Sequence, residues 1–509
     1  MQTCWSWVAV RSCGSAGWSD RGLRCSGATL VCEAPKADVM REYLKFFIDG
    51  GWVEPAQLAT LDVENPATEL VVGRIALGSA ADVDRAVKAA RAAFAAWSLT
   101  TREERLDVLN RIVTEYEKRF GDLMTAVTEE MGAPASLCQD AQVPAGLDHL
   151  IDATRILQDF PFQEVRGQTM IVREPIGVCG FITPWNWPLN QITHKVAPAL
   201  ATGCTMVLKP SEVAPFSGQI FAEVLDAARV PPGVFNLVHG DGPGVGVALA
   251  CHQDIDMVSF TGSTRAGIEV ARNAAATVKR VHQELGGKSP NIILDDDDLP
   301  GHVARGVRDV MNNSGQSCNA PTRMLVPTSR MAEVLAVAKQ TAELITVGDP
   351  TGDAILGPVV SRTQWNKING LIKTGVEEGA TLVTGGANRP EGLERGYFVK
   401  PTVFGNVSND MTIANEEIFG PVLVVLGYES IDQAIEISND TIYGLAAYVN
   451  GADTAQARIV ASRLQAGQVS INGASDPAAP FGGYKMSGNG REGGDFAFYE
   501  FLETKAVMG

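Results

Sequence analysis

The stretch Gln283-Glu-Leu-Gly-Gly-Lys-Ser-Pro290, followed by Gly315-Gln-Ser-Cys-Asn319, decides how the rest of the chain is interpreted. A carboxylate, Glu284, and a thiol, Cys318, lie 34 positions apart, and each has glycine nearby. Glycine lets the backbone form tight or left-handed turns and approach a ligand closely. A cysteine and a glutamate that meet in a cleft can form a covalent intermediate and then hydrolyse it. The two motifs therefore predict a catalytic pair.

Length, composition and charge limit the classes of function. The chain has 509 residues, of which 45% are apolar, enough for about two to four domains. Its net charge of −17 argues against binding nucleic acid or an anionic membrane through the overall field. No stretch approaches the ~18 unbroken apolar residues of a membrane span. Cysteines without Cys-x-x-Cys pairs indicate a reducing compartment, so we expect a cytoplasmic protein, and histidines without ligand spacing predict no metal.

Residues 1–36 differ in composition from everything after them. They hold four of the nine cysteines, three of the eight tryptophans and only two acidic residues. They lack the basic start and the apolar length of a secretory signal, and no clean amphipathic helix of a transit peptide emerges. We expect a disordered leader or a translation start placed too early, with Met40 as an alternative start.

Turn and cap signals predict the first elements after this leader. Asp49 and Gly50 predict a tight turn inside a hairpin over 46–52. Two capping-box patterns, at 79–82 and 101–104, each predict the start of a helix.

Short apolar strands alternate with helices from residue 177 onward. We predict strands near 177–183, 204–209, 234–238, 257–260 and 279–283, and helices near 215–229, 243–251 and 264–276. This alternation implies an α/β fold with a parallel sheet, whose ligands lie at the carboxyl ends of the strands. Asn186, Lys209, Gly262 and Glu284 each follow a predicted strand. A second alternation, over 291–472, predicts a second α/β domain.

The candidate catalytic residues each have a plainer interpretation. A lone cysteine is more often a small buried hydrophobe than a nucleophile, and Glu284 alone could be a surface carboxylate. The polar neighbours of Cys318 favour a reactive thiolate, with a pKa lowered by nearby backbone N–H groups. Asn186 lies in Thr-Pro-Trp-Asn-Trp-Pro, a restricted loop that could hold its amide toward a developing oxyanion, although a structural turn is the alternative.

Two further motifs suggest a phosphate-bearing cofactor. Phe260-Thr-Gly-Ser-Thr264 follows a strand and opens a helix, so its N–H groups could hold a phosphate. Lys209-Pro-Ser-Glu212 also follows a strand, although a Lys–Glu pair at this spacing is often a surface ion pair. The usual Gly-x-Gly-x-x-Gly fingerprint is missing between 235 and 265.

Taken together, these motifs resemble the NAD(P)-dependent aldehyde dehydrogenase superfamily of the hydrolytic, non-acylating type, from about Met40 to Gly509. The matching motifs are Pro-Trp-Asn-Trp-Pro (184–188), Lys-Pro-Ser-Glu (209–212), Phe-Thr-Gly-Ser-Thr (260–264), Glu-Leu-Gly-Gly-Lys-Ser-Pro (284–290), Gly-Gln-Ser-Cys (315–318), Glu-Glu-Ile-Phe-Gly-Pro-Val (416–422) and Pro-Phe-Gly-Gly-Tyr-Lys-Met-Ser-Gly-Asn-Gly-Arg-Glu (480–492). Seven motifs in order make the resemblance specific.

The resemblance implies oxidation of an aldehyde to a carboxylic acid. Cys318 would attack the aldehyde to form a thiohemiacetal, with Asn186 and the Cys318 N–H as oxyanion hole. Hydride transfer to the nicotinamide would leave a thioester, which water activated by Glu284 would hydrolyse. A carboxylate such as Glu212 at the ribose favours NAD, and NADP stays open. The implied cofactor contacts are Thr183, Trp185, Lys209, Ser211, Glu212, Gly262, Ser263, Leu285, Glu417 and Phe419.

The resemblance also implies a domain plan. A Rossmann-like cofactor domain would comprise 40–156 and 176–286, and an α/β catalytic domain 287–485. A small β element, 157–175 with 495–509, would join subunits into a homodimer or homotetramer. The leader 1–36 has no counterpart in the family.

Other functions compete with this interpretation. A CoA-acylating semialdehyde dehydrogenase would pass the acyl group to CoA, but members of that kind typically lack the glutamate that Glu284 supplies. A non-catalytic NAD-binding member would not need the complete set of Cys318, Glu284 and Asn186. A cysteine hydrolase would need a histidine base near Cys318, which no motif indicates. No motif identifies the aldehyde, although Trp187 and Phe481 favour an aliphatic or aromatic chain.

Overall fold

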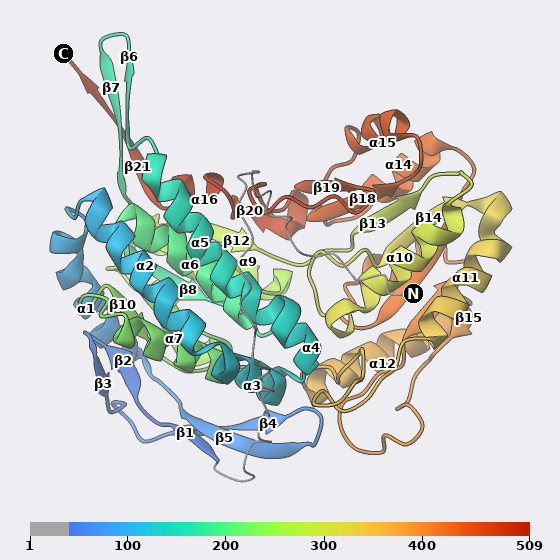
Figure 1. The fold of residues 1–509 in the computed structure, drawn as a ribbon, viewed down its shortest axis with the longest axis horizontal. Helices are drawn as coiled ribbons and strands as arrows, with labels where there is room; N and C mark the ends of the chain where they lie inside the picture. Colours follow the sequence, from blue (N-terminus) through green and yellow to red (C-terminus); the bar gives the residue numbers. More distant parts are fainter. Residues whose placement is uncertain (1–39) are drawn as a thin grey trace, which may run out of the picture. The chain divides into compact units, whose positions relative to one another are not determined.

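An eight-stranded sheet positions much of the candidate site (Figure 1). The computed structural model describes residues 40–509, and the leader expected over 1–36 lies outside them. The strand order is β20-β12-β11-β8-β9-β10-β2-β3, in which β20 is Gly488–Asn489, β2 is Phe46–Ile48 and β3 is Gly51–Val53. Five central strands run parallel and lie within one residue of their expected bounds: β8 (Val178–Ile182), β9 (Thr205–Lys209), β10 (Phe235–Leu237), β11 (Met257–Thr261) and β12 (Arg280–Glu284).

The expected turn and caps are present. Strands β2 (Phe46–Ile48) and β3 (Gly51–Val53) form an antiparallel hairpin. Asp49 and Gly50 between them have φ of 55° and 72°, the left-handed pair that a type I′ turn requires. Both capping boxes are formed, at the starts of α1 (Ala80–Trp97) and α2 (Arg102–Lys118).

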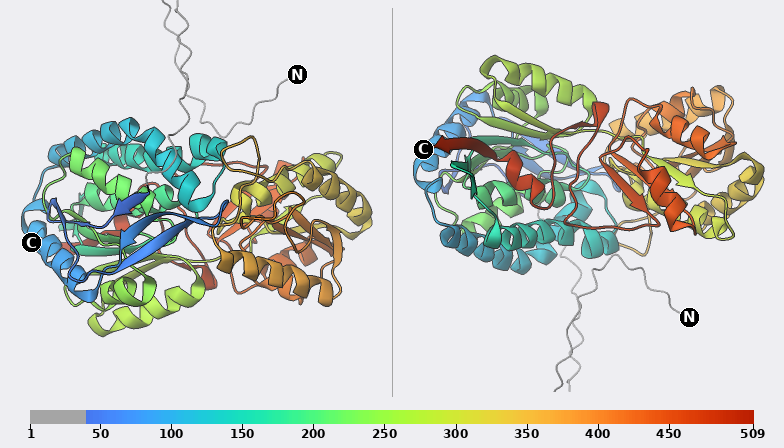
Figure 2. Two further views of the ribbon diagram at one scale, coloured as in Figure 1. Left: turned by 90° about the horizontal axis from the view of Figure 1, so that it is seen from below. Right: turned by 90° about the horizontal axis from the view of Figure 1, so that it is seen from above.

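Helices cover both faces of this sheet, as the two views in Figure 2 show. Successive strand residues face opposite sides, so the buried strands contribute to two cores. On β9, Val207 packs in the core of α1, whereas Met206 and Leu208 pack in the core of the opposite helices. The first face carries α1, α8 (Val247–Cys251) and α9 (Thr264–Ala274), and the second carries α2, α3 (Phe120–Met131), α5 (Val143–Asp159), α6 (Pro188–Thr202) and α7 (Phe216–Ala227).

The helix expected over 243–251 differs in its first turn. Residues Gly242–Gly246 form a π-helical turn, and the α-helix begins only at Val247. The side chain of Asp241 accepts a hydrogen bond from the Gly244 N–H at 2.7 Å. Three glycines in this turn make the wider winding accessible, and the sequence periodicity does not reveal it.

A second, seven-stranded sheet carries the second α/β alternation that the sequence predicts. Its order is β15 (Thr381–Thr384), β16 (Thr402–Gly405), β17 (Val422–Tyr428), β14 (Arg323–Pro327), β13 (Pro290–Ile293), β18 (Ala446–Asn450) and β19 (Gln468–Ile471). All neighbours are parallel except β15 and β16. One face packs on α10 (Leu299–Met311) and α11 (Met331–Glu343), and the other on α12 (Arg362–Glu377), α14 (Ile431–Asn439) and α15 (Thr454–Ala461).

Two three-stranded sheets complete the fold. The carboxyl-terminal strand β21 (Leu502–Met508) pairs with the hairpin of β7 (Thr169–Pro175) and β6 (Gln163–Arg166), and Figure 1 shows the three side by side. The first residues of the β element expected over 157–175 belong to α5, which continues to Asp159, so the hairpin itself begins at Gln163. The remaining elements are β1 (Arg41–Tyr43), β4 (Thr60–Asn65), β5 (Leu70–Ala76), α4 (Ala135–Leu137), α13 (Thr412–Asn415), β20 (Gly488–Asn489) and α16 (Phe496–Glu500).

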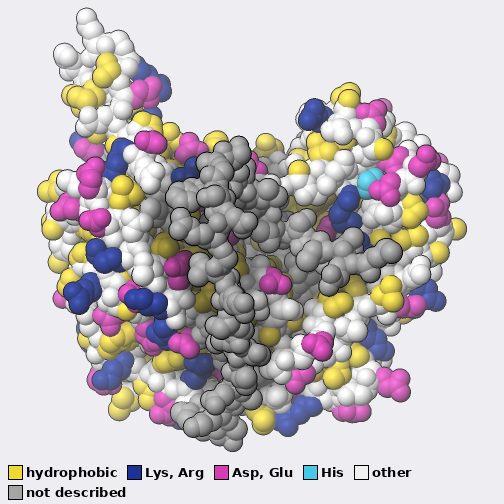
Figure 3. Space-filling model, viewed as in Figure 1, with side chains coloured by type: hydrophobic (Ala, Val, Ile, Leu, Met, Phe, Trp, Pro, Cys, Tyr) yellow, Lys and Arg dark blue, Asp and Glu magenta, His cyan; other side chains and the backbone are white. Residues whose placement is uncertain are grey.

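Charged side chains of both signs are interspersed on the surface. Outside the grey atoms, Figure 3 shows acidic and basic side chains scattered among each other on the face that it draws. Among residues 40–509, no helix combines the length and the apolar character needed to cross a membrane.

Candidate active site

The carboxyl ends of four neighbouring strands form one side of the candidate site. Lys209 and Glu284 are the last residues of β9 and β12, and Gly262 directly follows β11. The Thr183 N–H donates to the Lys209 carbonyl at 3.1 Å, and the Gly262 N–H donates to the Glu284 carbonyl at 3.0 Å. Backbone hydrogen bonds therefore hold these residues at one edge of the sheet, where α/β folds bind ligands.

The motif after β9 forms an ion pair that is largely shielded from solvent. Lys209 is only 3% exposed, and its Nζ lies 2.7 Å from Glu212 Oε2. Ser211 Oγ accepts the Val213 N–H at 3.2 Å, which fixes the turn. Thr183 Oγ1 is buried without a hydrogen-bond partner in the described part of the chain. This corner presents polar groups that a ribose hydroxyl can pair with.

The next strand leads into a helix whose first N–H groups face the same edge. Ser263 is the N-cap of α9, and its Oγ accepts the Ala266 N–H. Leu285 packs against Gly267 so closely that a Cβ there would lie 2.5 Å from Leu285 Cδ2. The helix N-terminus is therefore anchored next to Glu284, and its first N–H groups are of the kind that binds a phosphate.

A strained loop holds the thiol. After α10, Asn313, Ser314 and Gly315 have φ of 53°, 54° and 71° in succession. Left-handed conformations of non-glycine residues are costly and persist where the surroundings enforce them. Asn313 Nδ2 donates to the carbonyls of Asn186 (2.9 Å) and Gln316 (3.2 Å), which locks the loop that ends at Cys318.

Asn186 contacts this loop directly. Its Nδ2 donates to the Gln316 carbonyl at 3.0 Å, and its own carbonyl accepts from Gln142 Nε2 at 3.0 Å. The neighbouring Trp187 Nε1 donates to Ser317 Oγ at 2.8 Å. The asparagine amide is therefore held rigidly beside the residues that precede Cys318. One of its two N–H donors is engaged in the Gln316 bond, and the second is available for a ligand.

The glycine pair after Glu284 passes between Glu417 and the cysteine. The Gly287 N–H donates to Glu417 Oε1 at 2.9 Å, and a Cβ at Gly286 would lie 2.5 Å from Glu417 Oε2. A Cβ at Gly287 would lie 2.4 Å from the Cys318 carbonyl oxygen. The opening motifs of the sequence therefore meet in space, and glycine is required at the contact.

We expect Gly287→Ala to lower kcat by about 100-fold, because its methyl group displaces the Cys318 backbone and small misplacements cost about that much. Steady-state NADH absorbance measures the change. Gly370→Ala is the matched control, since no atom lies within 4 Å of its added Cβ. Equal rates for Gly287→Ala and Gly370→Ala would contradict the contact.

Two aromatic side chains from distant motifs pack against each other near the Glu417 segment. Trp185 and Phe419 pack edge to face, with ring centroids 5.4 Å apart. Phe419 has a left-handed φ of 61°, which turns the chain directly after Glu417. Together these side chains make an apolar wall close in the chain to Glu417, which is half-buried.

The pKa of Cys318 differs from the sequence-based expectation. Burial raises the pKa of the thiol well above its ordinary value, and the carboxylates of Glu417 and Glu284 raise it further. The backbone N–H groups of Cys318 and Asn319 lower it, as expected, but by less. The predicted lowering is therefore wrong, because burial and the charges of two carboxylates distant in sequence outweigh the backbone N–H groups. A cationic cofactor beside it would offset their effect.

A buried cluster of charged and histidine side chains lies behind Glu284, and no sequence motif indicates it. Lys195 of α6 bonds Glu492 Oε1, and His194 Nδ1 lies 3.2 Å from Glu492 Oε2. His282 lies between Glu492 and Glu284. Although burial opposes it, Lys195 and His194 hold the pKa of Glu492 well below its usual range. Burial, and to a lesser extent the charge of Glu492, raise the pKa of Glu284 well above its usual range.

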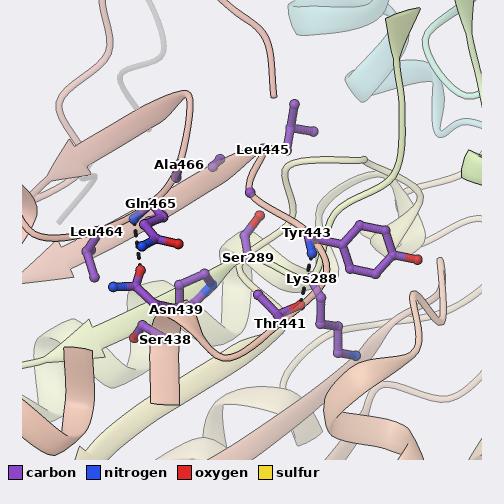
Figure 4. Close-up of a pocket in the computed structure, with 14 residues that line it drawn as sticks. Lys288, Ser289, Ser438, Asn439, Thr441, Tyr443, Leu445, Leu464, Gln465 and Ala466 are labelled. Carbon is purple, nitrogen blue, oxygen red and sulfur yellow. Dashed lines mark hydrogen bonds between the residues drawn. The ribbon is translucent and has the colours of Figure 1, made fainter. Parts of the chain in front are cut away.

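A narrow pocket lies beside the glycine motif (Figure 4), and Cys318, Glu284 and Asn186 are not among the residues that line it. Two hydrogen bonds join residues of its lining, from Gln465 N to Asn439 Oδ1 (2.8 Å) and from Tyr443 N to Thr441 Oγ1 (3.3 Å). Figure 4 shows the Lys288 ammonium group directed away from Asn439 and Gln465. Burial lowers the pKa of Lys288 to about 7. We assign this pocket no part in the chemistry of Cys318.

Comparisons with known proteins identify the family to which the chain is similar. The 3-succinoylsemialdehyde-pyridine dehydrogenase of a Pseudomonas species is 56% identical over 473 residues, 92% of this chain and 99% of that protein. A crystal structure of a Pseudomonas syringae aldehyde dehydrogenase mutant with NAD+ and octanal has a TM-score of 0.90 at 55% identity, over 91% of this chain and 96% of that one.

A Mycobacterium tuberculosis aldehyde dehydrogenase complexed with NAD+ has a TM-score of 0.90 at 40% identity, over 92% of this chain and 99% of that one. The model of the aldehyde dehydrogenase family matches residues 52–507. The chain therefore belongs to the aldehyde dehydrogenase family.

Proposed function

We propose that the protein oxidises an aldehyde to a carboxylic acid with NAD+ and releases the acid by hydrolysis. One observation carries the proposal: the loop of Cys318 is bonded to Asn186 on one side and packed against Gly287, three residues after Glu284, on the other. This arrangement supports a site in which a nucleophile, an oxyanion donor and a base come from three distant motifs.

Each residue has a chemical role in this proposal. The Cys318 thiolate attacks the aldehyde carbon, and the alkoxide that forms is stabilised by the free N–H of Asn186 and the Cys318 backbone N–H. One preorganised donor of this kind is worth about 10²–10³ in rate. After oxidation leaves an acyl thioester on Cys318, Glu284 removes a proton from the water that attacks it.

The described residues fit a dinucleotide. The Lys209–Glu212 pair and the unpartnered Thr183 Oγ1 suit the adenine-side ribose, and the N-terminus of α9 at Gly262 suits the pyrophosphate. Glu417, with the wall of Trp185 and Phe419, suits the nicotinamide ribose and ring. NAD+, when bound, accepts the hydride from the former aldehyde carbon. Ser211, Ser263 and Leu285 support these contacts from the same edge.

The cofactor and the acyl acceptor are separate choices. The carboxylate of Glu212 favours an unphosphorylated ribose, so we propose NAD+ over NADP+. The presence of Glu284 favours water over CoA as acyl acceptor. Two relatives suggest the substrate class: one is named for a pyridine-bearing semialdehyde, and another was crystallised with octanal. We propose an aldehyde with an extended apolar or aromatic chain, in keeping with Trp187 and Phe481.

Steady-state rates over an aldehyde panel, with NAD+ and NADP+ in parallel and with or without CoA, test the proposed function. We expect NADH formation without CoA, highest with medium-chain and aryl-substituted aldehydes. Activity that depends strictly on CoA would reassign the protein to the acylating class. No NADH from any aldehyde at saturating NAD+ would make it a non-catalytic member.

We also propose the domain plan of 40–156 with 176–286 for cofactor binding, 287–485 for the nucleophile, and 157–175 with 495–509 for oligomerisation. Every residue of β21 after Leu502 is exposed, and an exposed edge strand readily pairs with another chain. Light scattering is expected to give a dimeric or tetrameric multiple of 54.1 kDa. A monomer at micromolar concentration would contradict the proposed role of β21.

A further inference from the structure

Tyr448 of β18 bonds the turn that carries Cys318. Its hydroxyl donates a hydrogen bond to the Asn319 carbonyl at 2.9 Å, across 129 positions of the chain. Ala447 and Val449 pack in the core of α12, α14 and α15, so Tyr448 faces the opposite side of the second sheet. That side carries α10 and the loop after it, in which Cys318 lies. The tyrosine therefore reaches the thiol's loop from a distant strand.

The thiol lies in a tight turn whose two central residues are Cys318 and Asn319. The Ala320 N–H donates to the Ser317 carbonyl at 3.1 Å and closes this turn. The peptide group between Asn319 and Ala320 is thus bonded at both ends, because its carbonyl accepts the hydroxyl of Tyr448. The backbone N–H groups of Cys318 and Asn319 favour the thiolate, in opposition to burial. The orientation of the turn therefore affects the nucleophile directly.

The strand that carries Tyr448 lies next to the continuation of the glycine motif. Tyr448 is opposite Asn291 of β13, the strand into which the motif of Gly287 leads. A Cβ at Gly287 would lie 2.4 Å from the Cys318 carbonyl oxygen. Two successive carbonyls of the turn are therefore restrained from this part of the sheet, one by contact with Gly287 and one by the bond from Tyr448.

We propose that Tyr448 is a positioning residue, whose hydrogen bond to the Asn319 carbonyl holds the Cys318 thiol in the geometry for attack on the aldehyde. The inference rests on the proposed function. Asn186 and Asn313 both bond the loop before the thiol, and Tyr448 supplies the matching restraint after it. Such restraints matter because a misplacement of about 1 Å can cost about 100-fold in rate.

The hydroxyl suits this role because it keeps its proton. Burial raises the pKa of Tyr448 above its ordinary value, and the charges of Asp309 and Cys318 raise it further. The O–H donor is therefore present at neutral and mildly alkaline pH. The effect of the Cys318 charge also means that the phenol lies within electrostatic reach of the thiolate.

Tyr448→Phe tests the proposal, because it removes the hydroxyl and keeps the ring. Stopped-flow absorbance at saturating NAD+ and aldehyde measures the NADH burst, whose rate should fall by about 10-fold or more. The rate at which iodoacetamide alkylates Cys318 should fall by about threefold or more, because the thiolate is less stabilised. The dissociation constant of NAD+ should be unchanged, since Lys209 and Gly262 lie at the edge of the other sheet.

Tyr428→Phe is the matched control. The Tyr428 hydroxyl also donates to a backbone carbonyl in the second sheet, that of Ile293 at 2.8 Å. This bond lies at the carboxyl ends of β13 and β17, whereas the loop of Cys318 enters β14 at its amino end. Both variants lose one bond of the same kind, so a rate that merely followed stability would fall in both. Only Tyr448→Phe should slow the burst and the alkylation, and melting temperatures show that each variant is folded.

An unchanged rate of either the burst or the alkylation in Tyr448→Phe would overturn the proposal, as would equal slowing in Tyr428→Phe. Absence of any NADH from wild type would instead overturn the proposed function. The alkylation rates need no aldehyde, so they test the placement of the thiol in either case.

Discussion

Cys318→Ala is expected to abolish aldehyde oxidation, lowering the turnover of NADH by at least about 10⁴-fold. Removal of a covalent nucleophile from an assembled site has an effect of that size or larger. Asn186, Glu284 and the proposed cofactor contacts remain in place, but no group in the described part of the cleft replaces the thiol. The measurement is steady-state NADH absorbance at saturating NAD+ and aldehyde.

Binding and mutation at another cysteine provide the controls. Cys318→Ala should retain NAD+ affinity, measured by calorimetry, because the proposed ribose and pyrophosphate contacts lie on the strand edge at Lys209 and Gly262. Cys251→Ala, at an exposed cysteine on α8, should keep wild-type turnover. Turnover by Cys318→Ala within tenfold of wild type would remove the thiol from the mechanism.

Glu284→Gln has the second largest expected effect, and it separates the two halves of the reaction. The thiol, Asn186 and the cofactor site are intact, so one equivalent of NADH should form at a rate near that of wild type. Hydrolysis should then slow by about 10²–10⁴-fold, the usual contribution of a general base. Stopped-flow absorbance is expected to show a burst followed by a nearly flat steady state.

The same variant should gain thermal stability at neutral and alkaline pH. The folded-state pKa of Glu284 is raised above its unfolded value, so its contribution to stability is present at low pH and lost as the pH rises. Glutamine removes that pH-dependent loss. The melting temperature should therefore exceed that of wild type at pH 8, with a gap that narrows toward pH 4.5. A lower melting temperature throughout would instead indicate a damaged core.

Local chemistry made much of the fold predictable from the sequence. The parallel strands β8, β9 and β11 are buried apolar runs, and such runs between helices mark a doubly covered sheet. The caps at Ser79 and Thr101 need only four residues each. Gly286 and Gly287 were informative because their missing side chains let Glu417 and Cys318 approach.

The missed features depend on groups that are distant in the chain. Lys195 and Glu492 are 297 positions apart, and nothing in the local pattern of either one predicts the pair. The net pKa of Cys318 depends on Glu417, from another motif, and on burial that only the packed structure defines. His282 was visible two residues before Glu284, and the period of a strand could have indicated that their side chains share a face.

The most direct test of the account is the mass of Glu284→Gln after incubation with NAD+ and an aldehyde substrate. We predict an acyl adduct on the peptide that contains Cys318, formed with one equivalent of NADH and persisting for many wild-type turnover times. An unmodified Cys318 peptide after the same NADH burst, or an adduct on another cysteine, would contradict the division of labour between Cys318 and Glu284.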